Sequence, residues 1–104
     1  MAEIILGRLD ELKDGGAKRF DGEGYRIAVV RIGDSVYAIG DRCSHADISL
    51  SEGEVHAEDR TLECWKHVST FSLEDGHPQT LPATKPVPTY DARVEAGRII
   101  VVVD

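Results

Sequence analysis

Short apolar runs separated by turn-forming residues occupy both ends of the chain, and this pattern predicts β-strands. Residues 25–32 are rich in Val and Ile, as expected for a buried strand. Residues 89–95 alternate, with Tyr90, Ala92 and Val94 on one face of the strand and charged side chains on the other. Further strands are predicted over residues 3–8, 18–20, 35–39 and 98–103, with a single turn over residues 9–12.

Glycine-containing segments mark the turns between these strands. Gly33 and Asp34 lie between two apolar runs, and a glycine at the first central position is typical of a type II′ hairpin. Residues 96–97 turn the chain before the last strand, and residues 21–24 form the turn that precedes the run at 25–32. No stretch of helical periodicity is longer than a turn or two. We therefore expect an all-β fold, built as an antiparallel sandwich or barrel.

The middle of the chain, from Cys43 to about Pro88, has a different composition. Most of its apolar residues are isolated from one another. All four histidines, both cysteines and all four prolines of the chain fall within it. We interpret this region as an insertion in a β scaffold that needs something other than a hydrophobic core to hold it together.

Length and charge limit the function classes. A chain of 104 residues predicts one domain over residues 1–104, which is too small for a core together with a large enclosed substrate cavity. Acidic residues outnumber basic residues 19 to 12, giving a net charge of −7. This charge argues against nucleic acid and anionic membranes as partners. A protein with a basic docking patch is the partner class that it favours, although an acidic surplus is often only a solvated surface.

The N-terminal residues and the longest apolar run bear on the compartment. Met1 is followed by Ala2 and Glu3, without the basic region that opens a signal peptide. The apolar run over residues 99–103 is far shorter than a membrane span. We expect a cytoplasmic protein, in which two cysteines do not form a structural disulfide.

Two short motifs within the middle region carry metal-binding chemistry. Cys43 and His45 form a C-x-H motif, and Cys64 and His67 form a C-x-x-H motif. Two loops that each offer a thiolate and an imidazole can close a metal site, and the binding energy would order a region poor in core residues. One zinc ion and a [2Fe-2S] cluster are both compatible with this ligand set. A cysteine–histidine nucleophile is disfavoured because the chain lacks room for a substrate cleft.

The mixed composition of each motif favours the iron–sulfur cluster over zinc. Zinc fingers usually pair cysteine with cysteine and histidine with histidine. When each loop supplies one cysteine and one histidine, each loop can reach both irons of a binuclear centre. In a Rieske centre one iron is held by two cysteines and the other by two histidines.

The chain resembles the Rieske ferredoxins of bacterial aromatic-ring dioxygenase systems, and also the Rieske proteins associated with iron–sulfur assembly. The resemblance is carried by residues 43–47 with Leu50 and Gly53, by residues 64–71, and by residues 81–86. It implies one Rieske [2Fe-2S] cluster bound by the four residues of the two motifs. It also implies a cluster-binding subdomain over about residues 43–71 and a proline loop over about residues 78–88.

The same resemblance implies a function. The chain is expected to carry single electrons from a flavin-containing ferredoxin reductase to a terminal non-haem iron, ring-hydroxylating oxygenase, and not to be an enzyme on its own. A role linked to iron–sulfur cluster assembly and a subunit of a nitrite-reductase-like complex are alternatives within the family. A zinc-stabilised interaction module is the alternative from another class.

Some residues depart from common family patterns. Trp65 and Val68 stand where many Rieske proteins have proline and glycine, which affects the shape and shielding of the second loop. Phe71 replaces a tyrosine of the respiratory-chain proteins, and the chain has no second pair of cysteines. Fewer hydrogen bonds to sulfur predict a potential near the bottom of the range of about −150 to +300 mV.

Residues around the motifs have candidate roles of their own. Ser69 is a candidate hydrogen-bond donor to a bridging sulfide or a cap of its turn, and Trp65 is a candidate packing lid. His56 and His77 are expected to be exposed turn residues; a mononuclear iron triad that includes Glu58 or Asp75 is the less favoured reading. Residues 55–62 are expected to form a lengthened hairpin loop.

Overall fold

The computed structural model describes residues 2–22, 24–42, 49–64, 69–79 and 86–103. Along these residues the chain is built from β-strands and two short 3₁₀ helices, η1 (Leu9–Glu11) and η2 (Leu50–Glu52). The strands are β1 (Ala2–Arg8), β2 (Ala17–Gly22), β3 (Tyr25–Ile32), β4 (Ser35–Gly40), β5 (Val55–His56), β6 (Thr61–Glu63), β7 (Thr70–Ser72), β8 (Thr89–Glu95) and β9 (Arg98–Val103). No helix among these residues is long and apolar enough to cross a bilayer.

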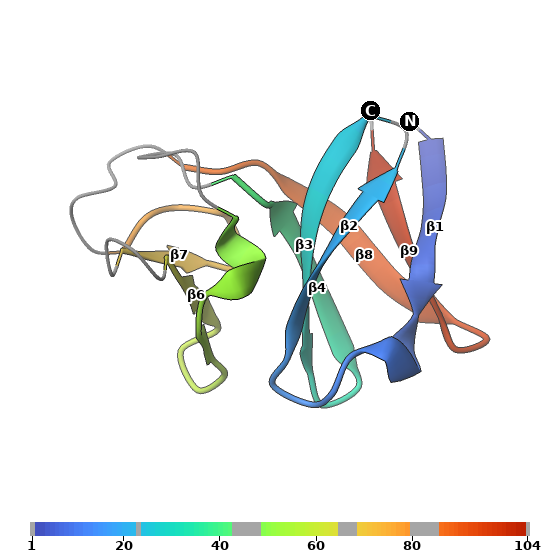
Figure 1. Ribbon diagram of the computed structural model, residues 1–104, viewed down its shortest axis with the longest axis horizontal. Coiled ribbons are helices and arrows are strands. Elements are labelled where there is room, and N and C mark those ends of the chain that lie inside the picture. Colours follow the sequence, from blue (N-terminus) through green and yellow to red (C-terminus); the bar gives the residue numbers. More distant parts are fainter. Residues whose placement is uncertain (1, 23, 43–48, 65–68, 80–85, 104) are drawn as a thin grey trace.

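The strands form two antiparallel sheets. Six strands make a curled sheet in the order β1-β9-β8-β4-β3-β2, and β5, β6 and β7 make a small sheet beside it (Figure 1). The two chain ends lie close together at one end of the large sheet, away from the small sheet (Figure 1). The prediction of an all-β, antiparallel fold is confirmed, and β3, β8 and β9 have the predicted bounds.

The predicted hairpins are present, with one difference in length. Gly33 has φ of +62°, as a type II′ turn requires at its first central position. Ala96 and Gly97 both have positive φ, at +51° and +75°, which is the type I′ arrangement. The expected turn over residues 21–24 was too long, because Asp21 and Gly22 continue β2 and pair with Arg26 and Tyr25 of β3.

Strand β3 separates two hydrophobic cores because successive side chains point to opposite faces of the sheet. Ile27 and Val29 face a core inside the curl of the large sheet, whereas Ala28 and Val30 face a core shared with the small sheet. The shared core also contains Ile39, Leu50, Leu62, Cys64, Phe71, Leu73 and Val87.

This shared core corrects our interpretation of the middle region. Leu50, Leu62 and Phe71 are each fully buried, although each is isolated from other apolar residues in the sequence. They converge because η2, β6 and β7 pack together against the large sheet. An ordinary hydrophobic core therefore holds the middle region to the scaffold, and cofactor binding would add to this stability.

Candidate metal centre

Of the four predicted ligands, Cys64 lies within the described residues. Cys43, His45 and His67 lie outside them, as do Trp65, Val68 and the core of the proline loop at residues 80–85. The structure therefore describes the segments from which each loop starts and to which it returns. These segments can be followed one loop at a time.

The first ligand loop, residues 43–48, starts and ends at residues that are bonded to each other. Arg42 and Ser49, which flank the loop, form an isolated antiparallel bridge. The amide of Leu50 donates a 2.6 Å hydrogen bond to the carbonyl oxygen of Asp41. The carboxylate of Asp41 accepts hydrogen bonds from the Ser49 hydroxyl and, at 2.9 Å, from the Ser51 amide.

The second ligand loop, residues 65–68, is closed in a similar way. Strands β6 and β7 pair up to Glu63 and Thr70, just outside the loop. The Cys64 amide then donates a 2.6 Å hydrogen bond to the carbonyl oxygen of Ser69. The loop is thus the connection of a tight hairpin, and its two ends are adjacent.

The proline loop is anchored on both of the other loops. At its start, Pro78 forms a bridge with Phe71, and the Gln79 amide donates a 2.6 Å hydrogen bond to the Thr70 carbonyl. Near its end, the Val87 amide donates a 2.9 Å hydrogen bond to the Gly76 carbonyl. Pro88 then accepts a hydrogen bond from the Gly40 amide at 2.8 Å, close to the start of the first ligand loop.

A glycine joins the first ligand loop to the second. Gly53 follows η2, and a Cβ atom at this position would lie 1.6 Å from the carbonyl oxygen of Glu63. Only a residue without a side chain allows this approach. Gly53 therefore brings the segment after the first loop against the strand that leads into Cys64, which gives a structural reason for the glycine in the motif.

Cys64 itself fits the role of a thiolate ligand. It is a free cysteine with no exposed surface, and it lies in the shared core with Leu62 and Phe71. Ser69 and Phe71, on the other side of the loop, are also fully buried. A soft sulfur donor that is buried beside the second ligand motif suits an iron–sulfur cluster or a zinc ion. Phe71 is a core residue, as expected.

The two other histidines differ from each other. His77 is exposed, as predicted. His56 is not the exposed turn residue that we expected, because it lies in β5, is one-third exposed, and its Nε2 is 3.1 Å from a Glu63 carboxylate oxygen. The turn of this hairpin covers residues 57–60 instead, and residues 55–62 include paired strands. Glu54 lies 3.9 Å from the same His56 nitrogen, so this imidazole already has two carboxylate neighbours within the small sheet.

Asp41 is a residue of the site that our sequence analysis missed. It lies just before the first ligand loop, is 2% exposed, and its carboxylate accepts hydrogen bonds from Ser49 and Ser51, which follow the loop. Its position two residues before Cys43 could have indicated this role, because carboxylates close to metal ligands commonly orient them. Alternation of apolar and polar residues gave no sign of it.

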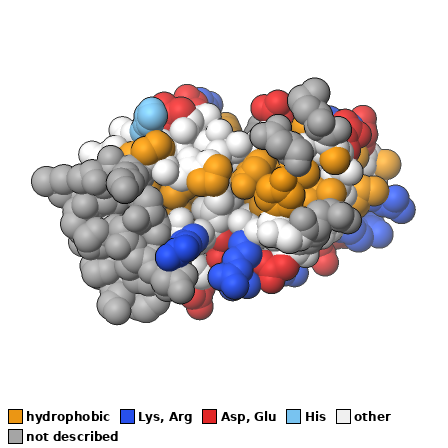
Figure 2. Space-filling view, turned by 90° about the horizontal axis from the view of Figure 1, so that it is seen from above, with side chains coloured by type: hydrophobic (Ala, Val, Ile, Leu, Met, Phe, Trp, Pro, Cys, Tyr) orange, Lys and Arg blue, Asp and Glu red, His pale blue; other side chains and the backbone are white. Residues whose placement is uncertain are grey.

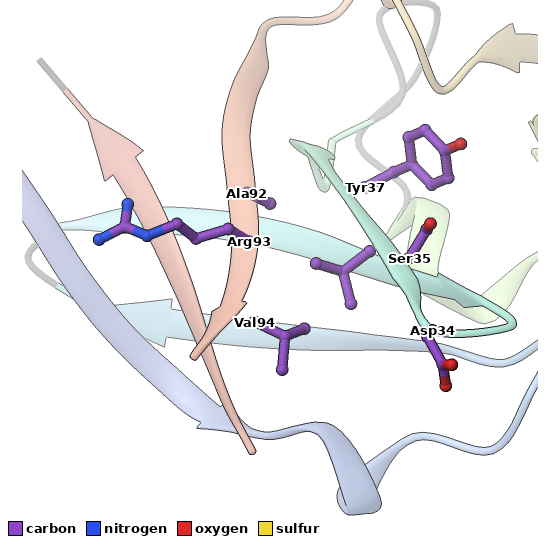
Figure 3. Close-up of a pocket in the computed structure, with 7 residues that line it drawn as sticks. Asp34, Ser35, Tyr37, Ala92, Arg93 and Val94 are labelled. Carbon is purple, nitrogen blue, oxygen red and sulfur yellow. The ribbon is translucent and has the colours of Figure 1, made fainter. Parts of the chain in front are cut away.

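The large sheet has a surface hollow that is separate from the ligand loops. Strand β4 pairs with β8 at two residue pairs before the strands diverge, and a hollow of about 340 Å³ opens there (Figure 3). Val36, Tyr37 and Val94 are among the residues that line it. The Arg93 side chain points away from Tyr37 towards β9 (Figure 3), and its guanidinium lies 2.9 Å from the Glu3 carboxylate. Its charge is therefore already paired.

Charged side chains of both signs are mixed on the face seen in Figure 2. Acidic and basic groups alternate around apolar side chains on this face, and no acidic patch dominates it (Figure 2). This arrangement supports the solvated-surface reading of the acidic surplus for the residues shown.

Comparison with known proteins shows the family. A model described as the Rieske [2Fe-2S] domain matches residues 2–91. The 3-phenylpropionate/cinnamic acid dioxygenase ferredoxin subunit of Escherichia coli K12 is 42% identical over 101 residues, which cover 97% of this chain and 93% of the relative.

Solved structures of ferredoxins have the same fold. The ferredoxin of carbazole 1,9a-dioxygenase from Nocardioides aromaticivorans IC177 superposes with a TM-score of 0.94 at 41% identity, over the full length of both chains. A ferredoxin solved in complex with the oxygenase of carbazole 1,9a-dioxygenase gives a TM-score of 0.87 at 31% identity, covering 96% of this chain and 92% of that one.

Proposed function

This chain belongs to the Rieske [2Fe-2S] family, and from that premise we propose that it passes electrons from a flavin-dependent reductase to a terminal ring-hydroxylating oxygenase. It is an electron-transfer component rather than an enzyme, and its cofactor is a single Rieske-type [2Fe-2S] cluster. The observation that carries the proposal is the full-length similarity to ferredoxins of two dioxygenase systems, one of which was solved bound to its oxygenase.

We assign the cluster ligands as Cys43 and Cys64 on one iron and His45 and His67 on the other. The support from the described residues is the burial of Cys64 and the hydrogen bonds and bridges among the residues that flank the three loops. Two thiolates and two imidazoles are the ligand set of a Rieske centre. A bound cluster would supply one-electron redox chemistry at these four residues.

The residues of the chain shape this transfer in two ways. The shared core excludes water from the sulfur side of the site, because Cys64, Ser69 and Phe71 have no exposed surface. The histidine side is expected to be the edge through which the electron leaves. Close packing around Cys64, on the buried sulfur side, fixes this proposed ligand in place.

Metal analysis tests the cofactor and its ligands. We expect freshly purified protein to be brown and to contain iron and acid-labile sulfide in equal amounts, with the electron paramagnetic resonance (EPR) spectrum of a Rieske centre after reduction. We also expect a reduction potential near the bottom of the range of about −150 to +300 mV. A colourless protein that contains zinc would overturn the assignment in favour of a zinc-stabilised interaction module.

Reconstitution tests the place of the chain in electron transfer. The holo protein is mixed with a flavin-dependent ferredoxin reductase, NADH and a ring-hydroxylating oxygenase, and reduction of the protein and product formation are followed. We expect the protein to be required for turnover. If it accepts electrons but supports no oxygenase, and deletion of its gene lowers iron–sulfur enzyme activities, the assembly-linked alternative is correct.

A reducing compartment follows from the proposed ligands. Thiolates that bind iron must stay reduced, and the described Cys64 is not in a disulfide. We therefore propose a cytoplasmic location, which fractionation of cells that express the tagged chain can test.

A further inference from the structure

We propose that Asp41 is the positioning residue of the first ligand loop, and that its buried carboxylate sets the geometry in which Cys43 and His45 are presented to iron. This inference rests on the proposed function, since it concerns two of the proposed ligands. It adds a residue that lies outside both ligand motifs. The argument starts from the contacts of the carboxylate.

The Asp41 carboxylate is buried, and its contacts lie on the far side of the loop. It is 2% exposed, and both of its oxygens accept hydrogen bonds. The Ser49 hydroxyl donates to Oδ2, and the Ser51 amide donates to Oδ1 at 2.9 Å. The hydroxyl oxygens of Ser49 and Ser51 are also 2.9 Å apart. Hydrogen bonds to a charged acceptor are stronger than neutral ones.

The backbone of Asp41 is fixed as firmly as its side chain. Its amide donates to the carbonyl oxygen of Arg26 in β3 at 3.2 Å, and its own carbonyl accepts from Leu50 at 2.6 Å. Leu50 is fully buried in the shared core. Asp41 thus joins the large sheet to the segment that follows the loop. The residues on both sides of the 43–48 segment are therefore held in place through Asp41.

The neighbouring cation does not account for these contacts. Arg19 Nε lies 3.9 Å from Asp41 Oδ2, but it lies 2.9 Å from an Asp21 oxygen and is more than one-third exposed. The short contacts of the Asp41 carboxylate are those to Ser49 and Ser51, just after the loop. An orientation role is the one that explains why a carboxylate is buried at this point.

The test compares variants of the purified holo protein. Asp41→Asn keeps the shape of the side chain but replaces one acceptor oxygen with a donor. Ser49→Ala removes the hydrogen bond to Oδ2, together with the contact between the Ser49 and Ser51 hydroxyls, and leaves the carboxylate in place. Asp21→Asn is the matched control, because it alters an exposed carboxylate on the same Arg19 and does not touch the loop. The double variant Asp41→Asn/Ser49→Ala shows whether both substitutions act through the same Asp41–Ser49 hydrogen bond.

Two measurements separate positioning from simple stabilisation. The first is the rate at which the folded protein loses iron to a chelator, and the second is the EPR spectrum of the reduced protein. We expect iron loss to be about ten- to hundredfold faster in Asp41→Asn and Ser49→Ala, in line with loss of one hydrogen bond to a charged group. We also expect shifted g-values in both variants, wild-type behaviour in Asp21→Asn, and a double variant no worse than Asp41→Asn.

The contrary outcomes are distinct. If both variants unfold more easily but keep the wild-type spectrum and rate of iron loss, Asp41 has only a structural role and the proposal is wrong. If Asp41→Asn does not fold, Ser49→Ala decides the question by the same measurements. Wild-type protein without iron would instead overturn the proposed function.

Discussion

The amide of Cys64 donates a 2.6 Å hydrogen bond to the carbonyl oxygen of Ser69, so the second ligand loop starts and ends at residues in direct contact. Both residues are fully buried. This hydrogen bond closes the hairpin at the base of the loop. Substitutions of Cys64, before the loop, and of Ser69, after it, should have different effects on cluster binding and reduction potential.

Replacing Cys64 with serine should remove cluster binding and stability together. The hydroxyl is a poor ligand for iron and places a polar group in the shared core, where Cys64 has no exposed surface. We expect little iron and a lower free energy of unfolding, measured by metal analysis and denaturant titration. Full iron content in this variant would show that Cys64 is not a ligand.

Replacing Ser69 with alanine separates the two roles considered for its hydroxyl. If the hydroxyl bonds a cluster sulfur, its loss destabilises the more negative reduced state, and the reduction potential falls. We expect a lower midpoint in a redox titration, together with a loss of about 1 kcal/mol in stability. An unchanged potential with the same loss of stability would identify the hydroxyl as a cap of the turn.

Replacing Gly53 with alanine should disturb the contact between the two ligand loops. The added Cβ would lie 1.6 Å from the Glu63 carbonyl oxygen, so the segment after η2 must move away from β6. We expect a loss of about 1–3 kcal/mol, the usual cost of overpacking, and faster loss of iron.

Gly97→Ala is the control for this prediction. Gly97 has φ of +75° and open space around its Cα, and it lies in the distant hairpin of β8 and β9. The control should lose stability through backbone strain but keep the wild-type rate of iron loss. Equal rates of iron loss in the two variants would contradict the role given to Gly53.

The pair of Glu3 and Arg93 predicts a pH dependence of stability. The Arg93 guanidinium donates a hydrogen bond to the Glu3 carboxylate, and its charge adds to the effect, so the pKa of Glu3 lies below its usual range. A lowered pKa in the folded state means that this contribution is present above the unfolded pKa and is lost as the pH falls through the folded pKa. Glu3→Gln should therefore be less stable than wild type at neutral pH and equal to it in strong acid.

Salt provides the check on this pair. The carboxylate is exposed, so added salt should reduce the difference between Glu3→Gln and wild type at neutral pH. Denaturant titrations at low and high ionic strength measure this difference in the free energy of unfolding. A difference that persists in acid would mean that Glu3 acts through packing and not through its charge.

The large sheet was predictable from the sequence because its hairpins are encoded locally. Gly33 and residues 96–97 carry the turn chemistry, and the strands beside them are long enough for an apolar pattern to be visible. The small sheet was not predictable in the same way. Its strand β5 has two residues, and Leu50, Leu62 and Phe71 meet through contacts that link distant parts of the chain.

The sequence motifs predict the ligands of the candidate site, but they did not predict the residues that support its loops. Cys64 lies buried at the loop where the motif placed it. Asp41 was missed because its role depends on residues 49–51, which return to it only after the ligand loop. The ligand roles of Cys43, His45, Cys64 and His67 stay predictions.

The packing around Cys64 has a consequence for the speed of the carrier. Every electron that arrives or leaves changes the preferred lengths of the bonds to iron, and the surrounding atoms must adjust before the transfer is complete. With Leu62 and Phe71 closely packed in the same interior, the Cys64 sulfur has little room to move. If Cys64 holds iron as proposed, the aliphatic and aromatic side chains around it would therefore limit the reorganisation energy of each transfer.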